Sequence, residues 1–152
     1  MASELDLAMM RRALELAQQA ADLDEVPVGA VLVVGGAIVA EGYNERERAK
    51  DPTAHAELLA IARAAKALDR WRLSGATIYA TLEPCPMCAG AMVNARIDRL
   101  VYGADDPRAG AVRTLFAIAD DQRLNHRVEI ERGVLADECG ELLRAFFKKK
   151  RK

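Results

Sequence analysis

Two cysteines and one histidine are the residues whose types and spacing best suit the binding of a metal ion. Cys85 and Cys88 are separated by two residues, so both sulfurs can bind one ion from the start of a helix. His55 offers a third ligand from well upstream in the chain. Zinc sites with three protein ligands are usually catalytic, because the fourth position is open to a water molecule. These residues therefore predict a catalytic zinc site.

Glu57 follows His55 by two residues and has the chemistry needed to move protons beside a metal. Zinc lowers the pKa of a bound water toward neutrality and so produces a nucleophile at ordinary pH. A carboxylate that lies near the metal without binding it can accept the proton and return it later as an acid. Glu57 is therefore the predicted catalytic residue.

The order His-x-Glu followed by Pro-Cys-x-x-Cys is more specific than either of its parts. A lone Cys-x-x-Cys pair also occurs in redox proteins and in structural zinc sites. The combined pattern is the signature of zinc-dependent nucleobase deaminases. In this chain it comprises His55–Glu57 and Pro84–Cys88, and it predicts that class of reaction.

Length and composition place the chain among soluble globular proteins. With 152 residues, 51% apolar and 30% charged, it is expected to form one domain over residues 1–152. It has no apolar run of about eighteen residues, so no membrane span is expected. The N-terminus carries acids where a secretory signal would carry bases, and two of the three cysteines form the metal pair. A cytoplasmic location is therefore expected.

Positive charge is concentrated at the end of the chain, where residues 148–152 are all Lys or Arg. The formal net charge is −1, but taking these five from the 22 Lys and Arg leaves 17 bases against 23 acids, about −6. A body this acidic is not a general nucleic-acid binder. A polynucleotide substrate would need a local basic surface, which the tail could provide; the tail could equally be a solvated helix end.

The first part of the chain carries one helix pattern and two strand patterns. Ser3 to Asp6 resembles a capping box, and apolar residues at helical spacing predict a helix over 4–21. Apolar and β-branched residues over 28–34 and 37–43 flank a Gly-Gly pair, which predicts a hairpin. The first of these strands is almost continuously apolar, so it should be covered on both faces.

The metal-binding residues are predicted to lie at the starts of two helices. Thr53 is the expected N-cap of a helix whose first turns contain His55. Pro84 suits the first turn of a second helix, over about 85–95. Backbone N–H groups at the start of that helix would favour the thiolate form of Cys85.

Strand and helix patterns alternate through the rest of the chain. The remaining predicted elements are strands at 77–81, 100–102 and 127–132, loops at 45–51 and 103–110, a short helical turn at 115–119, and a last helix from 135 with one apolar face. Because strands and helices alternate after the hairpin, the fold class is predicted to be an α/β sandwich built on one mixed sheet.

Four further residues have an ordinary structural interpretation beside a functional one. Cys139 lies on the apolar face of the last helix and is expected to be a core thiol. His126 precedes a strand without metal-ligand spacing and is expected to be a loop residue, with a substrate contact as the alternative. Trp71 would anchor a loop or stack on a base, and Asn44 would satisfy a strand end or contact a substrate.

Five segments of the sequence resemble the bacterial tRNA-specific adenosine deaminases. The zinc pattern alone indicates only the wider cytidine deaminase superfamily, whereas the segments outside it narrow the resemblance to the tRNA enzymes. Together the segments are distributed over nearly the whole chain. They are Glu25–Val31, Asp51–Glu57, Thr81–Met92, Asn125–Ile130 and Leu135–Cys139.

This resemblance implies a reaction, a fold and a set of residue roles. The reaction is deamination of the wobble adenosine to inosine in the anticodon stem-loop of an arginine tRNA, by a homodimer with one zinc per subunit. The fold is a cytidine deaminase-like three-layer sandwich with one five-stranded mixed sheet flanked by helices. Asn44 and the backbone of Ala56 would hold the base, Asp106 would meet the anticodon backbone, and Glu57 would catalyse. The zinc ligands would be His55, Cys85 and Cys88.

Two other functions remain open from the residues alone. A deaminase of free bases or nucleosides, such as guanine or cytidine, would share the whole metal site and would suit the acidic body. A noncatalytic zinc module that binds RNA would normally close its metal site with a fourth protein ligand. Such a module would have no use for Glu57 beside the metal.

Overall fold

One mixed sheet of five strands forms the centre of the computed structural model, which describes residues 2–151. Strand β1 pairs antiparallel with β2 and β3, whereas β4 runs parallel to both β3 and β5. This arrangement confirms the predicted hairpin and the five-stranded mixed sheet. In their order across the sheet, the strands are β2 (Ala37–Tyr43), β1 (Gly29–Val34), β3 (Ala76–Leu82), β4 (Arg99–Ala104) and β5 (Glu129–Glu131).

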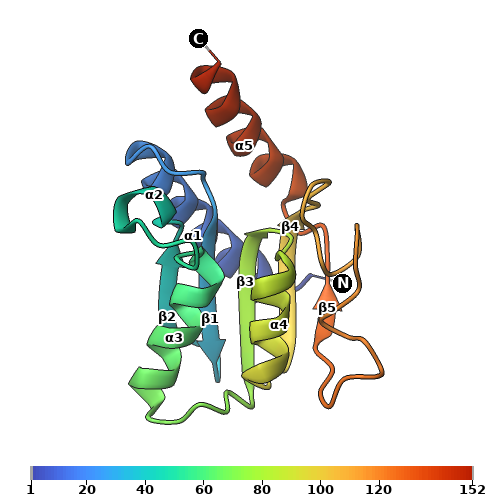
Figure 1. Cartoon of the computed structure of the whole chain (residues 1–152). Coiled ribbons are helices and arrows are strands. Elements are labelled where there is room, and N and C mark those ends of the chain that lie inside the picture. The colour runs from blue at the N-terminus through green and yellow to red at the C-terminus, as the bar shows by residue number, and fades with distance from the viewer. Residues whose placement is uncertain (1, 152) are drawn as a thin grey trace.

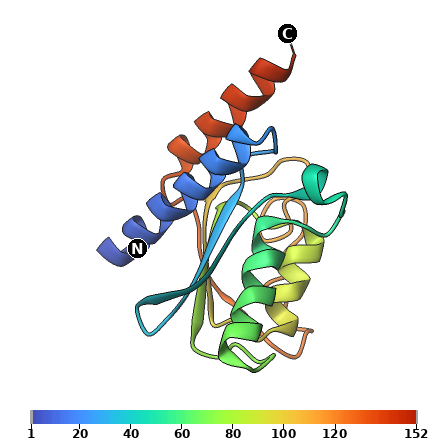
Figure 2. The ribbon, with the colours of Figure 1, turned by 90° about the vertical axis from the view of Figure 1, so that its left-hand side faces the viewer.

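Helices cover both faces of this sheet, which confirms the predicted three-layer sandwich (Figures 1 and 2). Helices α1 (Glu4–Asp22) and α5 (Ala136–Lys150) lie on one face, and α3 (Ala56–Leu68) and α4 (Pro86–Asn94) lie on the other. The end of α5 extends beyond the sheet (Figure 1). The remaining helix, α2 (Arg46–Ala49), is a single turn. Between residues 2 and 151, no helix combines the length and the apolar character that a membrane crossing requires.

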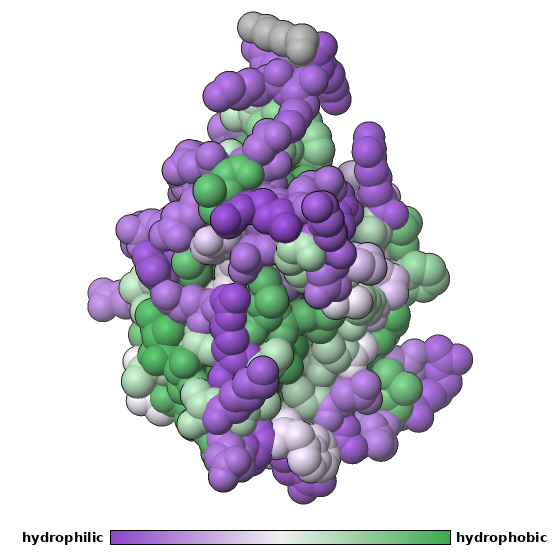
Figure 3. All heavy atoms as spheres, turned by 60° about the vertical axis from the view of Figure 1, so that its left-hand side comes forward, coloured by the Kyte–Doolittle hydropathy of each residue, from purple (hydrophilic) through white to green (hydrophobic). Residues whose placement is uncertain are grey.

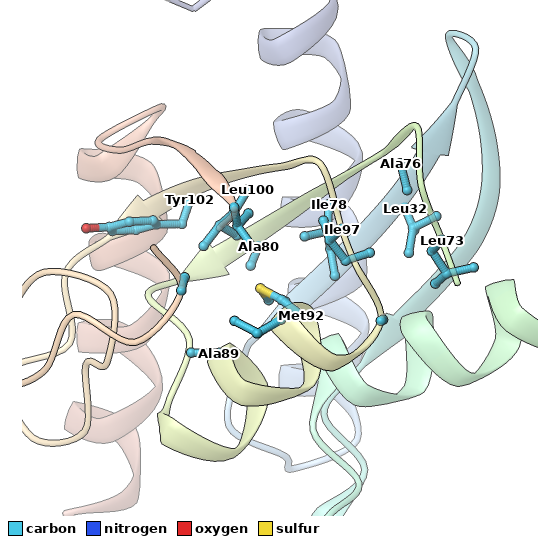
Figure 4. Packing of buried hydrophobic residues seen from close by; sticks show 14 of the residues in the cluster. Leu32, Leu73, Ala76, Ile78, Ala80, Ala89, Met92, Ile97, Leu100 and Tyr102 are labelled. Atoms are coloured by element: carbon cyan, nitrogen blue, oxygen red, sulfur yellow. The ribbon is translucent and has the colours of Figure 1, made fainter. Parts of the chain in front are cut away.

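The strands bury side chains on both faces because successive residues point to opposite sides of a sheet. Leu32, Ile78 and Leu100 lie on the face covered by α3 and α4, in the same buried cluster as Met92 of α4 (Figure 4). Every residue of β1 except Val34 is buried, which confirms the strand predicted to be covered on both faces. The strand residues that pack on the other side, against α1 and α5, are Val31, Val33, Tyr79 and Val101.

Asp6 joins the start of α1 to the sheet through a buried network. Its side chain accepts a hydrogen bond from the N–H of Ser3, and the Ser3 hydroxyl accepts one from the N–H of Asp6, both at 3.1 Å. These contacts confirm the predicted capping box. The Asp6 carboxylate also accepts two bonds from Arg99, at 2.8 and 2.9 Å, and one from the Tyr79 hydroxyl at 2.8 Å. The Arg99 guanidinium holds the pKa of Asp6 well below its usual range.

Replacing Asp6 with Asn should lower the free energy of unfolding at neutral pH by about 1.5–3 kcal/mol, the range for hydrogen bonds to charged groups. Because the pKa of Asp6 is lower in the folded than in the unfolded chain, its contribution is complete above about pH 4 and is lost as the pH falls further. Urea unfolding at neutral pH and near pH 3 measures both effects. The difference between parent and variant should narrow at the lower pH. Glu4→Gln, at an exposed position in the same helix turn, is the control, and equal losses in both variants would contradict this role.

One predicted helix N-cap is wrong, and in a second helix, predicted over about 85–95 and found at Pro86–Asn94, a different proline occupies the first turn. Thr53 is not an N-cap, because its N–H and hydroxyl both donate to the Asp51 carboxylate, at 2.8 and 2.7 Å, and form a tight turn. Helix α3 begins directly after His55 instead. The first turn of α4 contains Pro86 rather than Pro84, although a proline suits that position in either case.

Three other predicted elements, a loop, a helical turn and a strand, differ from the structure. Part of the charged loop at 45–51 forms α2. The segment 115–119 is not helical, because the N–H of Ile118 donates to the carbonyl of Ala111 at 2.9 Å and folds this segment back on itself. Strand β5 is shorter than predicted, since the N–H of Val128 is used in another loop contact, with Ala119, at 2.9 Å.

Candidate metal centre and adjoining cavity

The starts of α3 and α4 bring His55, Cys85 and Cys88 together. Both helices begin at the same end of the sheet, on the same face (Figure 1). His55 directly precedes α3, Cys85 directly precedes α4, and Cys88 lies in the first turn of α4. The Nδ1 atom of His55 is 3.7 Å from Cys85 Sγ and 3.5 Å from Cys88 Sγ. All three ligand atoms lie within 4.8 Å of one another, so one ion could contact them all.

Gly42 allows the first turn of α3 to lie directly on β2. A Cβ atom at this position would be 2.6 Å from the carbonyl oxygen of Ala56 and 3.1 Å from the Cβ of Leu59. The first of these distances is well inside van der Waals contact, so a larger residue would push α3 away from the sheet. His55 and Glu57 would move with it, and the group of ligand atoms would open.

The spacing of the three ligand atoms fits a tetrahedral zinc ion. With Zn–S of about 2.3 Å and Zn–N of about 2.0–2.1 Å, a sulfur and a nitrogen ligand lie about 3.6 Å apart. The observed separations from His55 are 3.5 and 3.7 Å. Thiolates and imidazoles are also ligand types that bind zinc well. Within residues 2–151 the group comprises these three residues, which is the number of protein ligands in catalytic zinc sites.

The other cysteine and histidine, and the tryptophan, lie outside this group. Cys139 is 1% exposed and packs in the core, as predicted. His126 is a half-buried loop residue whose Nε2 lies 2.7 Å from the carbonyl oxygen of Ile97, which confirms its expected place in a loop. Trp71 is 62% exposed and lies against two arginine side chains rather than anchoring its loop in the core.

The three ligand side chains compete for protons. Hydrogen bonds with Cys88 and, to a smaller extent, His55 lower the pKa of Cys85 to about 4, against the opposing effect of burial. The bond between the two cysteines, together with burial, raises the pKa of Cys88. The contact with Cys85 raises the pKa of His55. Cys85 is therefore the thiolate of the group, and a cation bound to all three atoms would displace the remaining protons.

A cavity of about 200 Å³ adjoins the ligand atoms. It is smaller than typical sites for drug-sized ligands, which measure about 300–1,000 Å³, so its size suits a single base. Val26, Val28 and Leu82 give part of its wall an apolar character. Cys88, fully buried, is the only predicted site residue that does not line it. The six that do are Asn44, His55, Ala56, Glu57, Cys85 and Asp106.

Glu57 is the second residue of α3 and is 4% exposed. Burial disfavours the charged form of a carboxyl group, and it raises the pKa of Glu57 to about 7. A group with such a pKa exchanges a proton readily near neutral pH, which is the property required of a general acid–base. Glu57 lines the cavity but is not part of the group of ligand atoms.

The three residues predicted to hold a substrate line the cavity from different parts of the chain. Asn44 is 8% exposed, and its amide donates to the Val26 carbonyl at 3.3 Å and accepts from the Arg46 N–H at 3.1 Å. Asn44 thus forms hydrogen bonds with backbone groups near the end of β2. Its amide retains one N–H donor and one acceptor lone pair that could bind a substrate. Ala56 begins α3, where backbone N–H groups have no partner within the helix. Asp106 is half-buried and accepts from two N–H groups of its own loop.

Two residues of the cavity wall, Arg46 and Glu83, have no role assigned by the sequence patterns. Glu83 is 1% exposed. Burial opposes its charge, but hydrogen bonds from the Thr114 hydroxyl and from backbone N–H groups lower the pKa of Glu83 to about 2. Its sequence signal is an acid placed directly after an apolar strand, since carboxylates are rarely buried without partners. Arg46 lies in a charged stretch that carries no comparable signal.

Comparison with known proteins gives matches over nearly the whole chain. Residues 5–151 match the family described as MafB19-like deaminase. A tRNA-specific adenosine deaminase of Bacillus subtilis is 50% identical over 147 residues, which cover 97% of this chain and 91% of the relative. One from Haemophilus influenzae is 51% identical over 150 residues, which cover 98% of this chain and 87% of that relative.

Solved structures show the same likeness in the backbone. One from a study of A-to-I editing by tRNA:A34 deaminases at the wobble position has a TM-score of 0.86 and 43% identity, covering 90% of this chain and 99% of that one. One of a guanine deaminase from Nitrosomonas europaea has a TM-score of 0.77 and 27% identity, covering 96% and 85%. Both sequence and backbone are thus more similar to the first of these two structures.

Proposed function

Because this chain belongs to the tRNA-specific adenosine deaminases, we propose that it deaminates the wobble adenosine of an arginine tRNA to inosine, as a zinc-dependent homodimer in the cytoplasm. One catalytic domain over residues 1–152 would carry the whole activity. The observation that carries the proposal is the meeting of a His-Cys-Cys ligand group and the buried Glu57 at one base-sized cavity.

His55, Cys85 and Cys88 are the proposed zinc ligands. When bound, zinc would act as a Lewis acid that lowers the pKa of a water molecule toward neutrality. The buried position of Glu57 allows its carboxylate to accept a proton from the attacking water and to pass it to N1 of the adenine. The oxygen of that water adds to C6 of the adenine. The remaining proton of the added hydroxyl then passes through Glu57 to the amino group, the C6–N bond breaks, and ammonia leaves to give inosine.

The walls of the cavity suit an adenine that has left its stack. Asn44 and the backbone of Ala56 are the proposed contacts to the base, and Asp106 the proposed contact to the flanking backbone. Apolar residues of the wall exclude bulk water around the reacting ring. An anticodon loop makes extrusion of the base cheap, because the wobble base is unpaired.

A second hollow adjoins this cavity and leads toward the end of α5. The two share Val26 and Arg46, and the second also contains basic and aromatic side chains. Hydrophilic side chains gather over the projecting end of α5 (Figure 3). Of the five basic residues of the tail, Lys152 lies outside the described residues, and Lys150 pairs with Asp24 at 2.6 Å. This end of α5 is the proposed local basic surface for the stem-loop.

Changing Lys148, Lys149 and Lys150 to Ala should weaken binding of the anticodon stem-loop and flatten its salt dependence. Each lost phosphate contact makes the slope of log affinity against log salt shallower by about 0.7–0.9, because fewer counterions are released. Salt titrations of parent and variant measure this slope. The matched control changes Lys66, Arg70 and Arg72, at the opposite end of α3. Parallel titration lines for parent and tail variant would mean that the tail is only a solvated helix end.

The proposed dimer needs a surface for the partner subunit. Three large apolar residues in the loop between β4 and β5 are exposed: Leu115 by 51%, Phe116 by 56% and Leu124 by 41%. Exposed apolar side chains of this size commonly mark contacts with another protein. We propose that a second copy of this chain covers them, and sedimentation equilibrium of the purified protein tests the mass directly.

Activity measurements separate the proposed reaction from its rivals. Incubation with total tRNA, followed by sequencing for inosine, should identify the wobble position of arginine tRNA. Ammonia should be released from an anticodon stem-loop and not from free adenosine, guanine or cytidine. Release only from free guanine or cytidine would support a base or nucleoside deaminase instead. Stem-loop binding by the metal-loaded protein without ammonia release would support a noncatalytic RNA-binding module.

A further inference from the structure

Glu83 is a buried carboxylate whose hydrogen bonds go to the backbone of a distant loop. It lies between the end of β3 and Cys85 and is 1% exposed. The Thr114 hydroxyl also donates to it. The four backbone N–H groups that donate to its oxygens belong to Asp106 at 3.0 Å, Val112 at 3.1 Å, Arg113 at 2.8 Å and Thr114 at 2.9 Å.

These bonds fold the loop over residues 105–114 around one side chain. The backbone around Glu83 joins the same loop, because its N–H donates to the Ala104 carbonyl at 2.8 Å and the Pro84 carbonyl accepts from the Ala111 N–H at 2.9 Å. Asp106 and Ala109 of this loop line the cavity beside the ligand group. The segment that carries Cys85 and one wall of the cavity are therefore held to each other through Glu83.

Gly110 gives independent support for the closeness of this packing. A Cβ atom at Gly110 would lie 2.6 Å from the Asp106 carbonyl oxygen and nearer still to the Glu83 carboxylate. Both approaches are inside van der Waals contact, so a side chain at this position would displace the carboxylate or the loop. The loop therefore packs so closely around Glu83 that residue 110 has no room for a side chain.

We propose that Glu83 is a positioning residue that fixes the 105–114 loop as the wall against which the extruded base and its flanking RNA backbone are held. It acts through Asp106 and Ala109 rather than by transferring a proton. The substrate named here rests on the proposed function. The wall contributes to binding in the ground state and the transition state alike, so its loss should raise KM more than it lowers kcat.

Glu83→Gln tests this role with little change in size. A carboxamide replaces one of the two acceptor oxygens by an NH₂ group, so the backbone N–H groups that donate to that oxygen should lose their hydrogen bonds. We expect KM for the anticodon stem-loop to rise by about tenfold or more, with kcat within about threefold of the parent and with metal content unchanged. A fall in kcat at unchanged KM, or parent values for both, would overturn the proposal.

Thr114 and Gly110 test the same network without altering Glu83. Thr114→Val removes the hydroxyl donor and should raise KM by a smaller factor, whereas Thr114→Ser keeps the hydroxyl and should restore the parent KM. Gly110→Ala should raise KM in the same manner as Glu83→Gln. If Glu83→Gln does not fold, equal KM values for Thr114→Val, Thr114→Ser and the parent contradict the proposal.

Hydrogen exchange separates this proposal from the proposed function. The amides of Asp106, Val112, Arg113 and Thr114 should exchange faster in the folded Glu83→Gln variant than in the parent, whereas amides of the central strand β3 should not change. Unchanged exchange at those four amides would refute the positioning role whatever the substrate. A parent protein that does not deaminate the stem-loop would refute the proposed function alone.

Discussion

Replacing Glu57 with Gln is expected to reduce the rate of stem-loop deamination by about 10²–10⁴-fold, the usual contribution of a positioned general acid–base. The amide preserves the size of a side chain that is 4% exposed, so the walls of the cavity should keep their positions. It cannot carry a proton from water to N1 of the base, and this transfer is the step that should fail. Single-turnover rates, measured with enzyme in excess over the stem-loop, report that step directly.

The metal content of the same variant decides between two roles for Glu57. Because Glu57 lies outside the group of ligand atoms, the variant should retain about one zinc per subunit by elemental analysis. Glu15→Gln, which changes an exposed carboxylate on α1 away from the cavity, is the control and should behave as the parent. Loss of zinc from the Glu57 variant would mean that Glu57 is a ligand, and the proton-transfer role would be wrong.

Replacing Cys88 with Ser should remove both the metal and the activity. The serine hydroxyl does not ionise near neutral pH and is a poor ligand for zinc, so the site would retain only two good ligands. Zinc per subunit should fall from about one to near zero, deamination should become undetectable, and the melting temperature should drop. A strong chelator added to the parent should reproduce the loss of activity.

The third cysteine provides the matched control for this experiment. Cys139 is also almost completely buried, but it packs in the core between α5 and the sheet. Cys139→Ala should therefore lower the melting temperature while zinc content and kcat stay at parent values. A Cys88→Ser variant that retains full zinc occupancy would show that the metal site lies elsewhere.

Sequence patterns predict the helices and strands in which apolar residues recur at a regular spacing. The apolar run of β1 and the helical spacing of α1 each extend over several residues, so their periods are readable without tertiary information. The ligand group is also predictable, because both parts of its motif are short. Cys85 and Cys88 lie three positions apart at one helix start, and Glu57 lies two positions after His55. The structure places six of the seven predicted site residues around one cavity.

Contacts between segments far apart in the chain produce no regular pattern of residue types in the sequence. The Glu83 carboxylate binds N–H groups more than twenty residues further along the chain, and any residue except proline supplies an N–H. The failed N-cap at Thr53 has a different origin. Asp51 lies only two residues away, and the sequence alone does not show that Thr53 donates to it in a turn instead of capping the helix.

The way in which Glu83 holds its loop has a consequence for evolution and for engineering. Four of the five donors to the carboxylate are backbone amides, which are common to all residues other than proline. Exchange of the side chains of Arg108 or Ala109 therefore leaves the frame of the wall in place while altering the surface it shows to RNA. Selection for another anticodon context, or a library randomised at these positions, can change preference without rebuilding the loop. Such a library should tolerate most residues at Arg108 and Ala109 but should exclude proline, because the N–H groups of both residues donate to the Asp106 carboxylate.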